Sequence, residues 1–363
     1  MAFDLGKLFA SLQPKKILTP TKVVGIDFGS SSVKVVELEK REDSVALSTY
    51  GELQLGPYAG SPLGASVKLP LQKKTEALID VLRESGVTAK DAVFALPLSD
   101  SFITVMSLPI HADENIAARV HVEARKYIPV PVADVTLEWS DVTLQNEDDA
   151  PLSRDVLLVA IANQSVADTR ILLDSIGSAT SPAEIELFSS MRALTQSEDT
   201  SVAILDFGSA ISKLYITDRG VLQRLHRVQS GGIHATQKIA TTLGISLEEA
   251  ENKKRNYSLT DIHGETLKTS VEQTAIRALQ EFKRVFDQYE TRTGKKIART
   301  VMIGGTALFP NFGAFVGYTL DREVSVVDTF PKVSSPAFLT DTLESIAPSF
   351  ITALGAALRQ FES

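Results

Sequence analysis

Hydrophobic and polar residues form the same pattern twice along the chain. Residues 22–39 read KVVGIDFGSSSVKVVELE, and residues 201–218 read SVAILDFGSAISKLYITD. In each copy an apolar run ends in Asp, continues with Phe-Gly-Ser, and leads into an alternating run that carries Lys seven residues after the Asp. A polar turn and a third run follow, VALSTYGELQL in the first copy and VLQRLHRVQ in the second. Each copy therefore predicts three consecutive antiparallel strands, and the repeat predicts two pseudo-symmetric lobes.

Helical spacing of apolar residues fills much of the remaining chain. It predicts helices over 71–84, from a cap at Asp113 to just before Pro129, and over 165–175, 183–194, 232–243, 247–255, 271–289 and about 348–361. Short strand-like runs (AVFALP, SFITVMSLP, DVTLEWSDVTLQ and DVLLVAIAN) lie between the two copies. We therefore expect an α/β protein with an N-terminal segment (1–21), a first lobe (22–89), a small α+β insert (90–178), a connecting helix region (179–200) and a second lobe (201–363). The last helix is expected to pack back toward the first lobe.

Composition narrows the class of protein. The chain has 363 residues, enough for more than one core, and a formal net charge of −8, which argues against nucleic-acid binding. No run reaches the roughly 18–20 apolar residues of a membrane-spanning helix, and the start of the chain does not read as a secretory signal. The absence of cysteine excludes disulfides and is compatible with a cytoplasmic protein.

The two Asp-Phe-Gly-Ser turns carry the clearest chemistry. A glycine directly after a strand lets the backbone approach a phosphate, and successive N–H groups form an anion-binding nest. Ser30, Ser31 and Ser32 add hydroxyl donors to the first turn. The Asp that ends each strand would repel bare phosphate, so it fits a site in which Mg²⁺ and its waters lie between the two. Two such turns facing each other are suited to gripping the β- and γ-phosphates of a nucleotide.

Two other nucleotide-binding classes do not match. A protein kinase needs G-x-G-x-x-G, V-A-I-K and H-R-D-L-x-x-x-N motifs in order, and the nearest imitation here is His226-Arg227-Val228. The P-loop signature is also absent. A third glycine-rich turn, in TVMIGGTALFPNF, has two open interpretations: a backbone surface for a base or ribose, or an ordinary strand-to-helix turn.

Taken in order, these motifs resemble the superfamily of actin, sugar kinases and DnaK-type chaperones. GIDFGSSSVK and LDFGSAISK resemble its two phosphate loops, MIGGTALFPNF its adenosine motif, and SFITALGAAL its second connecting helix. Within it, the chain resembles the PilM family of cytoplasmic actin-like proteins of type IV pilus assembly. VHVEARKYIPVPVADVTLEW, VLLVAIANQSVADTRILLDSIG and GGIHATQKIA with EEAENKK are similar to further segments of that family. The resemblance implies a two-lobed actin-like ATPase fold of duplicated ribonuclease-H-like domains.

The resemblance also implies a site for ATP and Mg²⁺. It assigns phosphate contacts to Gly29, Ser30, Ser31, Ser32, Lys34, Gly208, Ser209, Gly231 and Gly232, and adenosine contacts to Glu251, Lys254, Gly304, Gly305 and Thr306. Asp27 and Asp206 would hold Mg²⁺, through water. The second turn has Ala and Ile at positions 210 and 211, so it has fewer hydroxyls than the first. The water-activating residue is not identified by sequence; the candidates are Glu184, Glu186 and Asp206. Because a good base contributes roughly 10²–10⁴ in rate, this predicts slow ATP hydrolysis at most and leaves enzyme status open.

The function implied is that of an ATP-binding scaffold. In PilM-like proteins the implied partner is the N-terminal cytoplasmic tail of the bitopic membrane protein PilN, captured by the insert and thereby holding the scaffold peripherally at the inner membrane. The alternative is an FtsA-like membrane tether that forms filaments in cell division. Such a tether is expected to carry an amphipathic tail after the last core helix, whereas this sequence ends at ALGAALRQFES. Self-association remains open in both cases.

Overall fold

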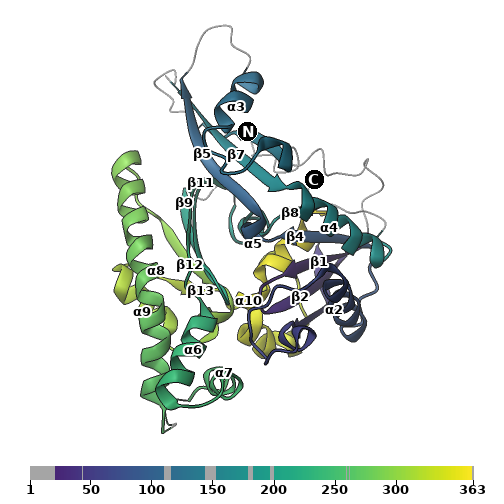
Figure 1. Cartoon of the computed structure of the whole chain (residues 1–363), viewed down its shortest axis with the longest axis vertical. Helices are drawn as coiled ribbons and strands as arrows, with labels where there is room; N and C mark the ends of the chain where they lie inside the picture. The colour runs from purple at the N-terminus through teal and green to yellow at the C-terminus, as the bar shows by residue number, and fades with distance from the viewer. Residues whose placement is uncertain are drawn as a thin grey trace.

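The computed structural model describes residues 21–42, 44–109, 116–143, 153–178, 183–196, 200–258, 260 and 262–361. The expected N-terminal segment, apart from Thr21, and the predicted cap at Asp113 lie outside these residues. The described residues form two five-stranded sheets, one in each lobe, and a three-stranded sheet extends from the first lobe (Figure 1).

The two large sheets have the same topology. The first contains β1 (Lys22–Phe28), β2 (Ser32–Lys40), β3 (Val45–Gln54), β4 (Asp91–Leu96) and β8 (Ala183–Ile185), in the order β3-β2-β1-β4-β8. The second contains β9 (Ser201–Phe207), β10 (Ser212–Asp218), β11 (Val221–Val228), β12 (Arg299–Ile303) and β13 (Ser325–Val326), in the order β11-β10-β9-β12-β13. In each sheet three consecutive strands pair antiparallel and the other two add in parallel.

Helices cover both sheets. The first lobe has α2 (Leu71–Glu84), α4 (Asn163–Ser175) and α5 (Glu186–Leu194), with the 3-10 turns η2 (Gly56–Ala59) and η3 (Leu98–Asp100). The second lobe has α6 (Gly232–Leu243), α7 (Leu247–Arg255), α8 (Gly264–Thr293), α9 (Phe312–Leu320) and η5 (Gly305–Leu308). The chain ends with η6 (Ala337–Leu339) and α10 (Thr340–Leu358). Most sequence-predicted helix ranges coincide with these, although α8 extends beyond the predicted 271–289 at both ends. Within the described residues, no helix is long and apolar enough to cross a membrane.

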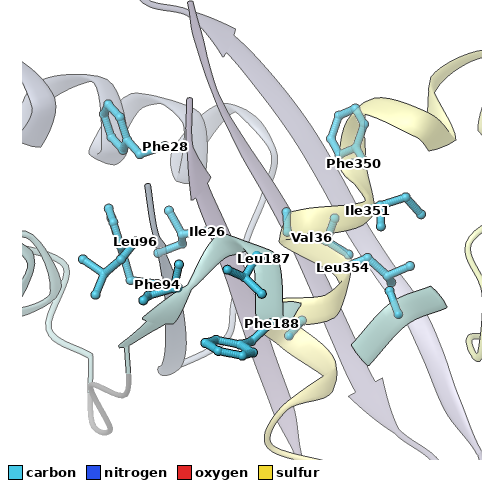
Figure 2. Packing of buried hydrophobic residues seen from close by; sticks show 14 of the residues in the cluster. Ile26, Phe28, Val36, Phe94, Leu96, Leu187, Phe188, Phe350, Ile351 and Leu354 are labelled. Atoms are coloured by element: carbon cyan, nitrogen blue, oxygen red, sulfur yellow. The ribbon is translucent and has the colours of Figure 1, made fainter. Parts of the chain in front are cut away.

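One core joins the two lobes. Ile26 of β1, Phe94 of β4, Phe188 of α5 and Leu354 of α10 belong to one buried cluster (Figure 2). The same cluster includes Ile204 and Val301 of the second sheet. On the opposite face of β1, a Cβ added at Gly25 would lie 2.0 Å from the Ala353 carbonyl oxygen. The missing side chain therefore lets α10 pack directly on β1.

The insert is smaller than the range 90–178 predicted from sequence. Its sheet, of order β5-β7-β6, consists of β5 (Ser101–Pro109), β6 (Val135–Asp141) and β7 (Ser153–Ala162), with α3 (Ile116–Ala124) and η4 (Val132–Asp134). These elements have a separate core that includes Met106, Val120 and Leu158. By contrast, β4 pairs in parallel with β1, and α4 packs on α2 and β4, so both belong to the first lobe. The predicted range was too long because the sequence of a short apolar strand does not show which sheet the strand joins.

Two further predictions need correction near the lobe boundary. The predicted helix at 183–194 begins as strand β8, which pairs with β4, and becomes helical only at Glu186. The last helix starts at Thr340 and not near 348. Pro348 lies inside the helix. Residues from about Val327 onward complete the first lobe: Phe330 belongs to the main core, and the Leu47 N–H donates to Ser334 O (2.9 Å).

Candidate functional site

The two repeated turns have nearly identical backbones. The Gly29 N–H donates to Ser32 O (2.9 Å), and the Gly208 N–H donates to Ile211 O (3.2 Å). A Cβ at either glycine would lie 3.0 Å from that carbonyl oxygen, which is a tight approach. Asp27 pairs with Lys34 across β1 and β2, as Asp206 pairs with Lys213 across β9 and β10. Each turn therefore presents a carboxylate and an ammonium on one face of its sheet.

Both turns open onto one cleft between the lobes, with a volume of about 1080 Å³. The sequence-predicted residues that line it are Asp27, Gly29, Ser30, Ser31, Ser32, Lys34, Glu186, Asp206, Gly208, Ser209, Gly232, Glu251, Lys254, Gly304, Gly305 and Thr306. Gly231 is not among the lining residues: a Cβ there would lie 2.5 Å from Ser209 O, so it packs beneath the second turn. Segments more than 270 residues apart in the sequence thus meet at one cavity.

The floor of the cleft holds charges of both signs. Lys213 Nζ donates to Glu186 Oε2 (2.7 Å) and to Asp206 Oδ2 (3.0 Å). Burial would lower the pKa of Lys213, but these two carboxylates raise it well above its usual value. Lys213 is therefore a fixed cation. Lys213 was not among the site residues predicted from sequence, although its place in the repeat, seven residues after Asp206, marks it.

Asp27 is a carboxylate whose charged form is disfavoured by its surroundings. Burial raises its pKa from 3.8 to about 7; Lys34 opposes that rise, and Glu186 adds to it. On the same turn, Lys34 Nζ donates to Ser32 Oγ (2.7 Å) and lies 3.3 Å from Glu52. The charge of Lys34 is therefore shared with another acid, and Asp27 is left without a dedicated cation.

The two candidate bases on the connecting segment lie in different environments. Glu184 is 1% exposed and ion-paired with Arg192 and Arg359, and it is not among the residues that line the cleft. Glu186 does line the cleft, and its Oε1 accepts the Leu98 N–H (2.7 Å). Of these two, only Glu186 can reach a bound molecule, and both of its oxygens are already hydrogen-bonded. The third candidate, Asp206, also lines the cleft and bonds to Lys213.

At the other end of the cleft, Glu251 is 4% exposed rather than on a solvated helix face. Burial would raise its pKa, but Lys254, at 2.6 Å, and Thr236, also at 2.6 Å, stabilise the charged form and lower it. Lys254 Nζ also donates to Gly232 O (3.1 Å), which ties α7 to the start of α6. This end is built from fixed polar groups that lie close to the second turn.

The third glycine-rich turn completes the wall. Gly304 has φ +91°, and a Cβ there would lie 2.5 Å from the Phe207 carbonyl oxygen. Its N–H donates to Pro348 O of α10 (2.8 Å). A positive φ and close packing both require glycine at this position, and Gly304 lines the cleft.

The carboxylates fit a hydrated metal better than a protein-only metal site. Within the described residues, no three His, Cys, Asp or Glu side chains are grouped so that they could hold a metal ion. Asp27 and Asp206 nevertheless line the same cleft beside the two turns. Mg²⁺ usually keeps several waters and takes one or two carboxylates plus phosphate oxygens, so this donor set fits Mg²⁺ that arrives with a nucleotide.

Comparisons with known proteins identify the family and the fold. Residues 25–361 match the family described as type IV pilus assembly protein PilM. A solved PilM–PilN type IV pilus biogenesis complex superposes with a TM-score of 0.78 at 20% identity, covering 94% of this chain and 99% of the other. The ethanolamine utilization protein EutJ from Carboxydothermus hydrogenoformans gives 0.54 at 17% identity, covering 97% and 93%. MreB5 of Spiroplasma citri bound to AMPPNP gives 0.50 at 12% identity, covering 92% and 94%. The predicted actin-like fold is confirmed.

Proposed function

Because this chain belongs to the PilM family of type IV pilus assembly proteins, we propose that it acts there as an ATP-binding scaffold. The observation that carries the proposal is the pair of matching glycine turns that open onto one interlobe cleft. The family match spans residues 25–361, which favours this function over the FtsA-like alternative. A kinase of small molecules has no supporting observation in this chain.

The nucleotide would lie along the cleft with its phosphates between the two turns. Backbone N–H groups after Gly29 and Gly208, with the hydroxyls of Ser30 and Ser209, would hold the phosphates. Asp27 and Asp206 would hold a hydrated Mg²⁺ that comes with the nucleotide, and this ion would supply positive charge beside those carboxylates.

The nucleoside would lie toward α7 and the third turn. Glu251 and Lys254 are held there by mutual hydrogen bonds, and Thr306 Oγ1 lies 3.5 Å from Gly208 O. Across the cleft, the Gly64 backbone packs against Glu251: a Cβ at Gly64 would lie 2.6 Å from that side chain. The residues 56–69 of the first lobe therefore reach over this end of the cleft, which suits enclosure of a flat base.

Hydrolysis is expected to be slow. Glu186 is the best-placed described candidate for a general base, and its two oxygens accept hydrogen bonds from Leu98 and Lys213. A carboxylate already bonded to an ammonium is a weaker proton acceptor for an attacking water. We therefore assign ATP chiefly the role of a ligand that favours one arrangement of the lobes.

The insert is the proposed docking element for the cytoplasmic tail of a PilN-like bitopic membrane protein. One solved structural relative is a complex of PilM with PilN. In this chain β6 is an edge strand of the three-stranded insert sheet and pairs only with β7 in the described structure. An extended peptide can add to such an edge through backbone hydrogen bonds. Binding in this way would hold the protein at the inner membrane through its partner.

Nucleotide binding is tested by thermal or chemical denaturation with and without Mg-ATP. At a hundred times the dissociation constant, Mg-ATP should stabilise the wild type by about 2.7 kcal/mol. Asp27→Ala and Asp206→Ala should lose most of that gain. Asp287→Ala is the matched control, because Asp287 lies exposed on α8 away from the cleft. Equal stabilisation of all four proteins would show that the two carboxylates do not support Mg-ATP binding.

The partner is tested by immobilising the protein with Mg-ATP and identifying what it retains from a solubilised membrane fraction. Recovery of a small bitopic pilus-assembly protein, lost when its cytoplasmic tail is deleted, would support the proposal. Recovery of division proteins alone would favour the FtsA-like alternative.

A further inference from the structure

The insert is joined to the first lobe by two chain connections, and the first of them also reaches the cleft; the second runs from β7 directly into α4. Strand β4 of the first sheet ends at Leu96, and η3 leads directly into β5 of the insert. Leu98, the first residue of η3, is 1% exposed and lines the cleft. Any rotation of the insert against the first lobe must therefore move, or turn about, the Leu98 peptide units.

Two different parts of the protein hold Leu98. Its N–H donates to Glu186 Oε1 (2.7 Å), from the start of α5 in the first lobe. Its carbonyl oxygen accepts Arg227 Nη1 (3.0 Å), from β11 in the second lobe. The root of the insert is thus bonded to both lobes through backbone groups that do not depend on the leucine side chain.

The Glu186 contact continues to the floor of the cleft. Lys213 bonds to the other Glu186 oxygen (2.7 Å) and to Asp206 (3.0 Å), the carboxylate that ends β9. A triphosphate placed between the two turns would bring several negative charges near this ammonium and compete with Glu186 for it. A change at the phosphates therefore passes to Leu98 through only two side chains, Lys213 and Glu186.

There is also space for the insert to move against the second lobe. A cavity of about 360 Å³ lies at the contact between β5 and β11, lined by residues that include Ile103, Leu222, Arg224 and Arg292. Beside this cavity the junction is packed, because Ile161 of β7, Ile103 of β5 and Leu222 of β11 belong to or pack against the core that joins the lobes. Arg292 reaches Asp155 of the insert only at 3.9 Å. The Arg227–Leu98 hydrogen bond is consequently a principal polar link between the insert root and the second lobe.

We propose that the Leu98 backbone, held by Glu186 and Arg227, is the joint through which occupation of the nucleotide cleft sets the orientation of the insert. Closure of the lobes moves β11, and with it Arg227, relative to the first lobe, while phosphate binding redirects Lys213 from Glu186. Both events act on the same residue at the base of the docking element. This inference rests on the proposed binding of nucleotide and adds the route by which binding reaches the insert.

The experiment measures the orientation of the insert directly. The chain has no cysteine, so two introduced cysteines can carry spin labels without background. His121→Cys on α3 and Glu84→Cys on α2 place one label on the insert and one on the first lobe, both at exposed positions. The label–label distance is then recorded by pulsed electron spin resonance with and without Mg-AMPPNP. Because both labels lie outside the second lobe, closure of the lobes alone leaves this distance unchanged.

Arg227→Gln is the test variant, and Arg224→Gln is the matched control on the same strand. Arg224 donates to Gln223 O and does not bond to Leu98. We expect Mg-AMPPNP to shift the distance in the wild type and in Arg224→Gln, and the shift to fall by at least about half in Arg227→Gln, with nucleotide affinity altered less than about threefold. Glu186→Gln, whose amide oxygen still accepts the Leu98 N–H, should also reduce the shift because it loses the charge that attracts Lys213.

The possible results distinguish a failure of this inference from a failure of the proposed function. If the wild type does not bind nucleotide, the proposed function and this inference fail together. Suppose that nucleotide binds but the label–label distance does not change, or changes as much in Arg227→Gln as in the wild type. The proposed role of Leu98 is then refuted, and the proposed nucleotide site is unaffected.

Discussion

Replacing Asp27 by Asn tests whether the cleft stores an unfavourable charge in the absence of nucleotide. The pKa of Asp27 is raised from 3.8 to about 7, mainly by burial. A raised carboxyl pKa means that the folded state binds the proton more tightly than the unfolded chain. Between about pH 4 and pH 7, the wild type should therefore lose stability as the pH rises. Asn does not titrate, so Asp27→Asn should not show this loss.

The size of the effect follows from the two pKa values. At about 1.4 kcal/mol per pH unit, the gap between 3.8 and about 7 corresponds to a penalty near 4 kcal/mol above pH 7. Asp27 is partly exposed to the cleft, so solvent reduces this figure; we expect ~2 kcal/mol. Nucleotide-free Asp27→Asn should thus gain ~2 kcal/mol over wild type on going from pH 4 to pH 8.

The assay is urea denaturation of both proteins without nucleotide and with chelator, at one-unit steps from pH 4 to pH 8. Asp287→Asn on the exposed face of α8 is the matched control and should follow the wild type. Asp27→Asn should also lose stabilisation by Mg-ATP, because the amide is a poorer partner for hydrated Mg²⁺. A stability difference between Asp27→Asn and wild type that stays constant across this pH range would refute the reasoning, since Asp27 would then ionise normally.

Three other substitutions test separate parts of the site. Gly304→Ala places a Cβ 2.5 Å from Phe207 O at φ +91°, so it should destabilise the protein by more than ~1 kcal/mol in denaturant melts; unchanged stability would mean that the turn relaxes freely. Glu184→Ala leaves Arg192 and Arg359 without their buried carboxylate and should cost ~3–5 kcal/mol by the same measurement, although nucleotide affinity at the remaining folded protein should be retained. Lys254→Ala should weaken ATP about tenfold in calorimetry while its neighbour Lys253→Ala does not, and equal affinities would remove Lys254 from the nucleoside end.

The two repeated turns could be predicted from sequence because their information is local. An apolar strand, Asp-Phe-Gly-Ser and an alternating strand fix a hairpin and its register, and the structure pairs Asp27 with Lys34 and Asp206 with Lys213 accordingly. Most helices could be predicted for the same reason, because the apolar spacing that marks a helix and the glycine that ends it lie within one short segment. The family resemblance then joined these pieces into one cleft, which periodicity alone does not do.

The misplaced boundaries share a different cause. Strand β4 looks like any short buried strand, and its assignment to the first sheet depends on parallel pairing with β1, more than 60 residues earlier. The segment around Phe330 likewise joins the first-lobe core from the far end of the chain. Such pairings are set by packing between distant segments, and no local pattern in the sequence distinguishes them.

Glu184 and Glu186 show the same limit at the scale of two residues. From sequence they were equal candidates on one helix. In the structure Glu184 is still on strand β8, where its side chain points into an arginine pair, and Glu186 begins α5 and faces the cleft. The change from strand to helix between them turns the two carboxylates to different surroundings, so the boundary itself decides which one can act on a ligand.

The pseudo-symmetry of the two turns is broken at their lysines, and this difference has functional weight. Lys34 bonds to Ser32 and faces Glu52, both within its own lobe. Lys213 occupies the equivalent register but bonds across the cleft to Glu186, at the base of the connecting helix. The backbone of the two turns is the same, so the difference comes from what each sheet faces: Lys34 faces β3, and Lys213 faces the start of α5. Phosphate bound at the first turn can therefore be neutralised locally, whereas phosphate bound at the second turn must alter an interlobe contact. If nucleotide binds as proposed, the duplicated hairpin would provide one turn suited to holding the ligand and one suited to transmitting its presence to the insert.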